Sequence, residues 1–133
     1  MKFHIFSKCP CTLILLKLIL KKLLVSYVNG KSVKNKIELH GRINNIYDSA
    51  TNKTSLILID AHGFNSYEVN KFFINTKLRY KTNIVLICDA EFKEYFTPFM
   101  YDAIIYKHLG VSEIKKEMTF ILNGIYKSVH SSS

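Results

Sequence analysis

Residues 55–60 (SLILID) form a near-continuous apolar run that ends in a carboxylate. A run of this kind is typical of a β-strand covered on both faces, as strands of parallel sheets are. Working outward along the chain, three further apolar runs follow the same pattern. They are Lys2–Phe6, Asn83–Cys88 and Ala103–Tyr106. The sequence therefore predicts several strands of one buried, parallel sheet.

Helical patterns alternate with these strands. Residues 12–28 predict a Lys-containing amphipathic helix that ends at Asn29-Gly30, and Asn65 with Glu68 predicts a capped helix start that continues to about Arg79. Ser112 is expected to cap a last helix with a core face at Ile114, Met118, Ile121 and Ile125. Weaker signals give a strand at 36–39, a polar loop at 40–54 and a short helix at 91–100 that Pro98 perturbs. Alternation of strands and helices indicates an α/β fold with a doubly wound, five-stranded parallel sheet.

The charge of the chain is uneven. The 133 residues carry a formal net charge of +9, and the first 37 residues contain eight Lys and no acid. Such a basic end can bind nucleic acid or a membrane surface, or it can be the solvated face of one helix. Lys17, Lys21 and Lys22 interrupt the apolar run 11–28, so we expect no membrane-spanning helix. Three Cys, an odd number, argue against a disulfide framework and favour a reducing, cytoplasmic location.

The sequence contains no strong motif for metal binding or for phosphate binding. Cys9-x-Cys11 with Cys88 and five scattered His lacks the spacing of a zinc ribbon or finger, so no metal site is predicted. The five Gly are isolated, which excludes a glycine-rich phosphate loop. In a doubly wound sheet, functional residues gather at the carboxyl ends of the strands. These ends hold Ser7, Lys8, Asp60, Cys88, Asp89 and Lys107.

The order of these residues resembles the receiver domain of bacterial two-component response regulators, particularly those with a LuxR-type helix-turn-helix. The run SLILID resembles the third receiver strand, which ends in the phospho-accepting Asp, here Asp60. Residues 102–107 (DAIIYK) resemble the fifth strand with its Lys, here Lys107. Residues 109–112 (LGVS) and 121–124 (ILNG) resemble the LuxR-type pattern, and Cys9-Pro10 fits the loop into the first helix. The resemblance implies a flavodoxin-like, three-layer sandwich with strand order 2-1-3-4-5.

The same positions also depart from the receiver pattern. Ser7 and Lys8 stand where receivers place two acids that hold Mg²⁺, and Cys88 stands where a Ser or Thr would bond the phosphoryl group. No Pro follows Asp60 in the next loop. We therefore expect a degenerate pocket of Ser7, Lys8, Asp60, Cys88 and Lys107, in which Asp60 pairs with Lys8 and Lys107 and is not phosphorylated.

The resemblance implies a non-enzymatic pseudo-receiver of a transcription regulator, with no catalytic residue, cofactor or metal. It would act by dimerisation, with itself or another response regulator, through residues 91–125, and Tyr95, Phe99 and Tyr106 are the expected interface residues. Residues 1–127 would form the domain, and 128–133 a disordered tail or linker stump. We expect no specific DNA binding by this chain and no membrane binding.

Two alternatives remain open. One is a stand-alone phosphorelay receiver that accepts phosphate at Asp60 with Mg²⁺. The other is a small basic protein that uses residues 12–28 against a membrane or nucleic acid.

Overall fold

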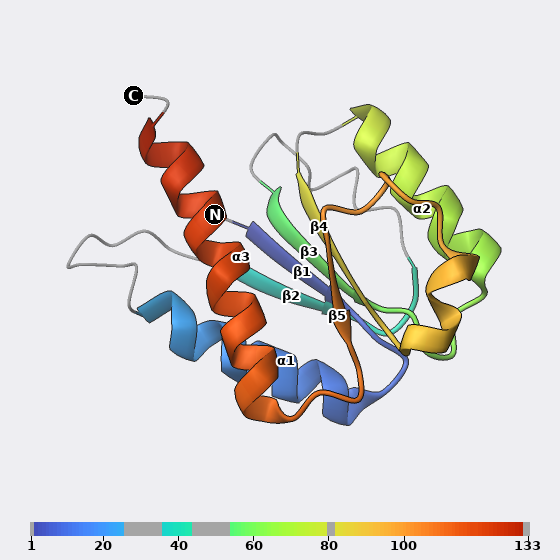
Figure 1. Ribbon diagram of the computed structural model, residues 1–133, viewed down its shortest axis with the longest axis horizontal. Coiled ribbons are helices and arrows are strands. Elements are labelled where there is room, and N and C mark those ends of the chain that lie inside the picture. The colour runs from blue at the N-terminus through green and yellow to red at the C-terminus, as the bar shows by residue number, and fades with distance from the viewer. Residues whose placement is uncertain (1, 26–35, 44–53, 80–81, 132–133) are drawn as a thin grey trace.

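The computed structural model describes residues 2–25, 36–43, 54–79 and 82–131. Strands and helices alternate along the chain (Figure 1). In chain order the elements are β1 (Lys2–Phe6), α1 (Pro10–Val25), β2 (Lys36–His40), β3 (Thr54–Asp60), α2 (Ser66–Arg79), β4 (Asn83–Cys88), the 3-10 helix η1 (Ala90–Tyr95), β5 (Ala103–Tyr106) and α3 (Val111–Ser131). The predicted α/β fold is confirmed.

The five strands form one sheet in the order β2-β1-β3-β4-β5, and every neighbouring pair is parallel. This is the predicted order. In the register, Phe6 lies beside Ile59 and Cys88 beside Tyr106, so the carboxyl ends of the strands share one edge. That edge holds the residues singled out above.

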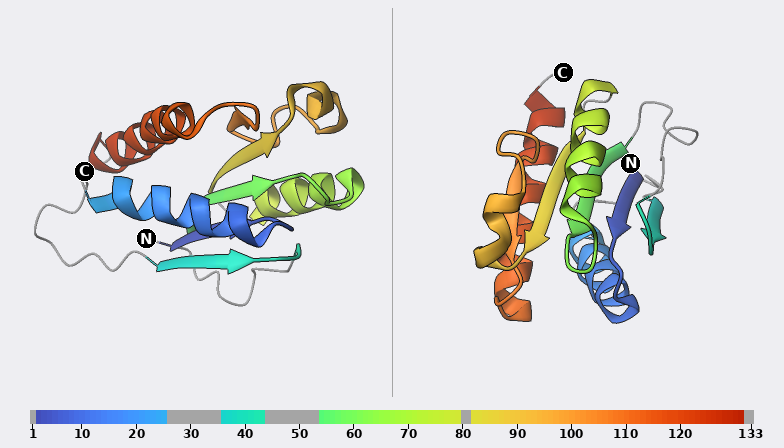
Figure 2. Two further views of the ribbon diagram at one scale, coloured as in Figure 1. Left: turned by 90° about the horizontal axis from the view of Figure 1, so that it is seen from below. Right: turned by 90° about the vertical axis from the view of Figure 1, so that its right-hand side faces the viewer.

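Helices cover both faces of the sheet (Figure 2). Alternate side chains of each strand point to opposite faces. Phe3, Ile5 and Leu58 pack on one face with α1 and α3, whereas Phe6 and Ile59 pack on the other with α2 and Phe96. The three-layer sandwich follows from the apolar runs, because both sides of the central strands are buried.

Three boundaries differ from the predicted ones. The first helix begins at Pro10, a residue suited to the first helical position because it lacks the backbone N–H that would be unpaired there anyway. The short helix predicted at 91–100 is a 3-10 helix over Ala90–Tyr95. Ser112 is not a cap, because α3 begins at Val111. Residues 26–30 and 44–53, which include the predicted helix end and most of the polar loop, lie outside the described residues.

The predicted start of the second long helix is confirmed. Asn65 precedes α2, and its side-chain Oδ1 accepts a hydrogen bond from the backbone N–H of Tyr67 at 2.8 Å, as an N-cap does. The last helix continues to Ser131, beyond residue 127, where the sequence placed the end of the domain. Within the part of the chain that the structure describes, no helix is long and apolar enough to cross a bilayer.

Candidate functional site

Asp60 is the last residue of β3, and its side chain is completely buried. A buried carboxylate is costly unless donors surround it. Oδ2 accepts a hydrogen bond from Ser7 Oγ at 2.8 Å and lies 3.1 Å from Lys107 Nζ. Oδ1 accepts one from the backbone N–H of His62 at 3.2 Å. Both carboxylate oxygens are therefore occupied by donors from the protein itself.

Ser7 follows β1 and reaches Asp60 because β1 and β3 are neighbours in the sheet. Its hydroxyl also accepts a hydrogen bond from the backbone N–H of Cys9 at 3.1 Å. One interaction uses the hydroxyl proton and the other a lone pair, so the buried hydroxyl is fixed in orientation. Ser7 thus joins the start of α1 to the carboxylate of Asp60.

Lys107 follows β5 and approaches Asp60 across β4. Its backbone N–H donates to the carbonyl of Cys88 at 3.0 Å, which fixes the strand end from which the side chain extends. The Nζ–Oδ2 contact is an ion pair in which the Lys107 side chain is 27% exposed and the Asp60 side chain is almost inaccessible. Such a pair compensates the cost of burying the carboxylate.

Lys8 does not take the position expected for it. Its side chain is exposed, and its Nζ lies 5.5 Å from the centroid of the Phe64 ring. Its Cβ and Cγ pass close to Gly63, whose φ of +83° suits a glycine and turns the β3–α2 loop toward Lys8. Within the described ranges, Asp60 pairs with Lys107 and not with Lys8. The prediction of two flanking ammonium groups is therefore wrong for Lys8.

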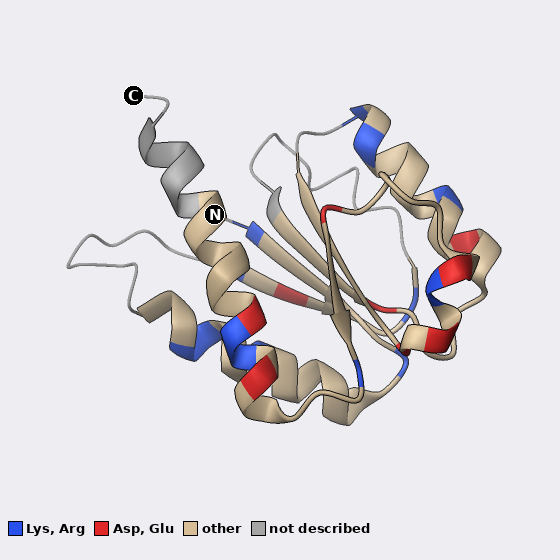
Figure 3. Ribbon diagram, in the orientation of Figure 1, with Lys and Arg blue, Asp and Glu red and all other residues tan. Residues whose placement is uncertain are grey.

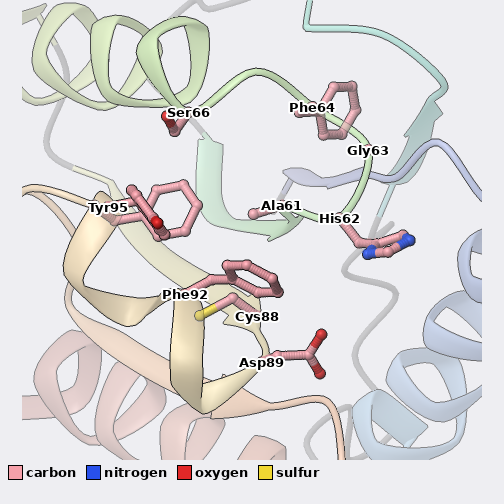
Figure 4. A pocket seen from close by; sticks show the side chains of 10 residues that line it. Ala61, His62, Gly63, Phe64, Ser66, Cys88, Asp89, Phe92 and Tyr95 are labelled. Carbon is pink, nitrogen blue, oxygen red and sulfur yellow. The ribbon is translucent and has the colours of Figure 1, made fainter.

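Cys88 ends β4 and is buried. Burial raises the pKa of its thiol, and the nearby charges of Asp89 and Asp60 raise it further. The thiol therefore stays protonated at neutral pH and offers only a weak hydrogen-bond donor. Its side chain lines a cavity (Figure 4).

This cavity has a volume of 320 Å³ and lies between the β3–α2 loop and η1. Two aromatic side chains of η1, Phe92 and Tyr95, face the loop across it (Figure 4). Its lining residues are Ala61, His62, Gly63, Phe64, Ser66, Cys88, Asp89, Phe92, Tyr95 and Phe96. No sequence pattern predicted this cavity, because most of its walls come from loops and a 3-10 helix.

The predicted interface residues lie in different surroundings. Tyr95 and Phe99 are 62% and 94% exposed. Tyr106 is half-buried and its ring stacks on His108. Phe96, from the same aromatic segment, is a core residue under α2. The aromatic segment thus divides into an exposed part and a core part.

The donor set beside Asp60 does not fit Mg²⁺. A hard divalent cation needs several oxygen ligands, chiefly carboxylates. At this edge, a hydroxyl and an ammonium follow β1, and the Asp60 oxygens already accept hydrogen bonds from Ser7 and His62 and pair with Lys107. Among the described residues, the one group of three side chains that could hold a metal ion is elsewhere, at His4, Glu38 and His40.

Comparison with known proteins supports the fold. No protein-family model matches the chain, and no curated protein matches it significantly. Among solved structures, the chain is similar to the crystal structure of the signal receiver domain of a DNA-binding response regulator protein (merR) from Colwellia psychrerythraea 34H. The TM-score is 0.62 at 13% identity, and the match covers 92% of this chain and 98% of that chain. The chain therefore has the fold of a signal receiver domain.

Proposed function

We propose that this chain is a non-enzymatic receiver-type module that acts through protein–protein contact and does not depend on phosphorylation. The observation that carries the proposal is the occupied state of Asp60, whose Oδ2 accepts from Ser7 Oγ and pairs with Lys107 Nζ. In a phosphorylated receiver, the corresponding carboxylate must attack a phosphoryl group while a divalent cation neutralises the developing charge. Among the described residues, both carboxylate oxygens already accept hydrogen bonds, and the side chains beside them do not form a set of Mg²⁺ ligands.

The exposed aromatic side chains of η1 and the following turn favour a contact surface. Phe92, Tyr95 and Phe99 are all exposed, and large apolar side chains grouped on a surface are common at protein interfaces. Phe99 also has a φ of 72°, which is unfavourable for a residue with a bulky side chain. An exposed aromatic side chain gains hydrophobic free energy when a partner buries it. We propose a second copy of this chain, or another protein with the receiver fold, as that partner.

The regulatory role belongs to the same proposal. A LuxR-type transcription regulator, of which this chain would be the receiver-type part, agrees with the sequence resemblance. Specific DNA binding by this chain alone is not expected. Its basic excess lies partly on α1, where Lys21 and Lys22 are exposed (Figure 3). Binding through such a surface is non-specific and weakens steeply with salt.

Sedimentation velocity over a wide range of protein concentrations tests the proposal. The parent chain should self-associate, or should bind a candidate regulator, and Tyr95→Ser should weaken this association. Asp60→Asn should leave it unchanged, because the charge state of Asp60 has no signalling role in this account. Leu78→Ser is the matched control, since Leu78 is a similarly exposed apolar side chain on α2. A parent chain that stays monomeric and binds no regulator would contradict the proposal.

A phosphorelay receiver is the second candidate, and one observation favours it. Lys107 contacts Asp60 from the end of β5, which is the arrangement that the receiver resemblance implies for a functional phosphorylation site. This candidate requires Mg²⁺ to bind beside Ser7 and Lys8. Replacing both with Asp should raise Mg²⁺ affinity strongly if their side chains are what prevents binding. Mg²⁺ binding by the parent chain with an affinity equal to that of this double variant would favour the phosphorelay candidate.

A further inference from the structure

A second group of polar side chains lies on β1 and β2, on the face of the sheet that α2 covers. His4 lies beside Glu38 in the parallel register, and Phe6 beside His40. Because side chains alternate along a strand, Glu38 and His40 point to the same face as His4. The Phe6 ring stacks on the His40 ring with centroids 4.5 Å apart, which holds His40 over the sheet.

Three potential ligand atoms converge there. His4 Nδ1 lies 2.9 Å from His40 Nε2 and 3.5 Å from Glu38 Oε2. His40 Nε2 lies 3.9 Å from the same Glu38 oxygen. A point equidistant from the three atoms lies about 2.0 Å from each, which matches the usual Zn–N and Zn–O distances.

We propose that His4 Nδ1, His40 Nε2 and Glu38 Oε2 form a binding site for a divalent transition-metal ion of the zinc class. Two imidazoles and one carboxylate form a donor set that suits such ions, and a water molecule would complete a four-coordinate shell. The site lies on different strands from Asp60 and would tie the edge strand β2 to β1.

The surroundings allow an ion to enter and orient the carboxylate. The His4 side chain is 1% exposed, whereas those of His40 and Glu38 are 16% and 27% exposed, so access is from the β2 side. Glu38 Oε1 pairs with Lys2 Nζ and with Lys36 Nζ, each at 3.4 Å. These contacts fix the carboxylate and leave Oε2 facing the two imidazoles. The two ammonium groups also repel a cation, so we expect moderate rather than very tight affinity.

Metal binding requires one local change. His4 Nδ1 and His40 Nε2 now share a hydrogen bond, and the donating ring must move its proton to its other nitrogen. His4 Nε2 is buried and has no hydrogen-bond partner among the described residues. If His4 Nδ1 is the donor, its proton must move to this buried Nε2, and if His40 Nε2 is the donor, its proton must move to His40 Nδ1. His4 Nδ1 and His40 Nε2 would then separate to about 3.3 Å, which is the distance between two ligand nitrogens in a tetrahedral zinc site.

The test uses the untagged chain with Cys9→Ser and Cys11→Ser, because both thiols are exposed and could bind zinc themselves. Calorimetry with Zn²⁺ and visible absorption with Co²⁺ should show one ion per chain. His40→Gln and Glu38→Gln should each weaken binding at least about tenfold. Both positions are partly exposed, so these variants should fold, which circular dichroism can check. His62→Gln is the control for an exposed histidine and should bind as the parent does.

Two results would overturn the proposal. One is the absence of Zn²⁺ binding and of Co²⁺ absorption bands at ion concentrations well above that of the protein. The other is unchanged affinity in both His40→Gln and Glu38→Gln, which would assign the ion to other surface groups. The sedimentation experiment on Tyr95 is independent of both results.

Discussion

Asp60 and His4 are both polar side chains buried in one sheet, but the protein compensates for their burial differently. Asp60 is charged, and a hydroxyl, an ammonium and a backbone N–H surround its carboxylate. His4 is neutral, because its pKa is lowered to about 4. Burial is the larger cause of this shift, and the neighbouring His40 is the second. One of its nitrogens bonds His40 and the other has no partner within the described part of the chain. The paired carboxylate of Asp60 therefore has a structural role, whereas the cluster of His4, Glu38 and His40 can still bind a ligand.

The largest effect on stability is expected from removing the ion-pair partner of Asp60. Lys107→Met leaves the buried carboxylate without its cation, and we expect the free energy of unfolding to fall by about 2–3 kcal/mol. Adding Asp60→Asn should restore part of this loss, because the charge that needs the cation is then removed. Lys116→Met, at an exposed position of α3, is the control and should change little. Urea denaturation compares the three variants with the parent, and equal losses for Lys107→Met and Lys116→Met would refute the structural role of the pair.

A comparable effect is the pH dependence that His4 gives to the free energy of unfolding, measured with a chelator present. The unfolded chain binds a proton at His4 below pH 6.5, whereas the folded chain does so only near pH 4. The free energy of unfolding should therefore fall by about 3 kcal/mol as the pH is lowered through this window, and the contribution should be complete above it. His4→Leu should flatten this part of the profile. His62→Leu, at an exposed histidine, should retain it, and a profile unchanged by His4→Leu would contradict the assignment.

The strands and the edge that holds the site were predictable from sequence for a simple reason. Apolar runs identify buried parallel strands, and such strands bring their carboxyl ends to one edge, which places Ser7, Asp60 and Lys107 together. The direction of Lys8 was not predictable, because it depends on the turn at Gly63 and on the Phe64 ring.

The histidine group could not be identified from spacing. His4 is separated from Glu38 and His40 by more than thirty residues, and only the β1–β2 register brings them together. The period-two spacing of Glu38 and His40 was the one local signal in the sequence. The 3-10 helix was also missed, because an aromatic-rich segment of this length fits either helical type.

A smaller effect is expected at Ser7. Ser7→Ala removes one donor from Asp60 and one acceptor from the backbone N–H of Cys9, and should cost about 1–2 kcal/mol. Ser112→Ala, at an exposed position in the first turn of α3, should cost much less. Thermal unfolding of the two variants compares them. A Ser7→Ala variant as stable as the parent would show that Lys107 and the backbone suffice to hold the carboxylate.

The smallest effect is expected outside both buried groups, at Phe99. Phe99→Gly relieves the positive φ and should stabilise the monomer by about 0.5 kcal/mol, despite the greater freedom of glycine in the unfolded chain. Phe99→Ala keeps the strain and should not stabilise it. If glycine and alanine have the same effect on the free energy of unfolding, backbone strain is not the cause.

The reactivity of Asp60 tests the central claim most directly. The unmodified chain is incubated with acetyl phosphate and Mg²⁺, beside a receiver domain known to be phosphorylated under the same conditions, and intact mass is measured. The account predicts no added phosphate on this chain, because Ser7, Lys107 and the backbone occupy the carboxylate and Mg²⁺ lacks its ligands. A stoichiometric, Mg²⁺-dependent and hydroxylamine-labile phosphate on Asp60 would contradict it.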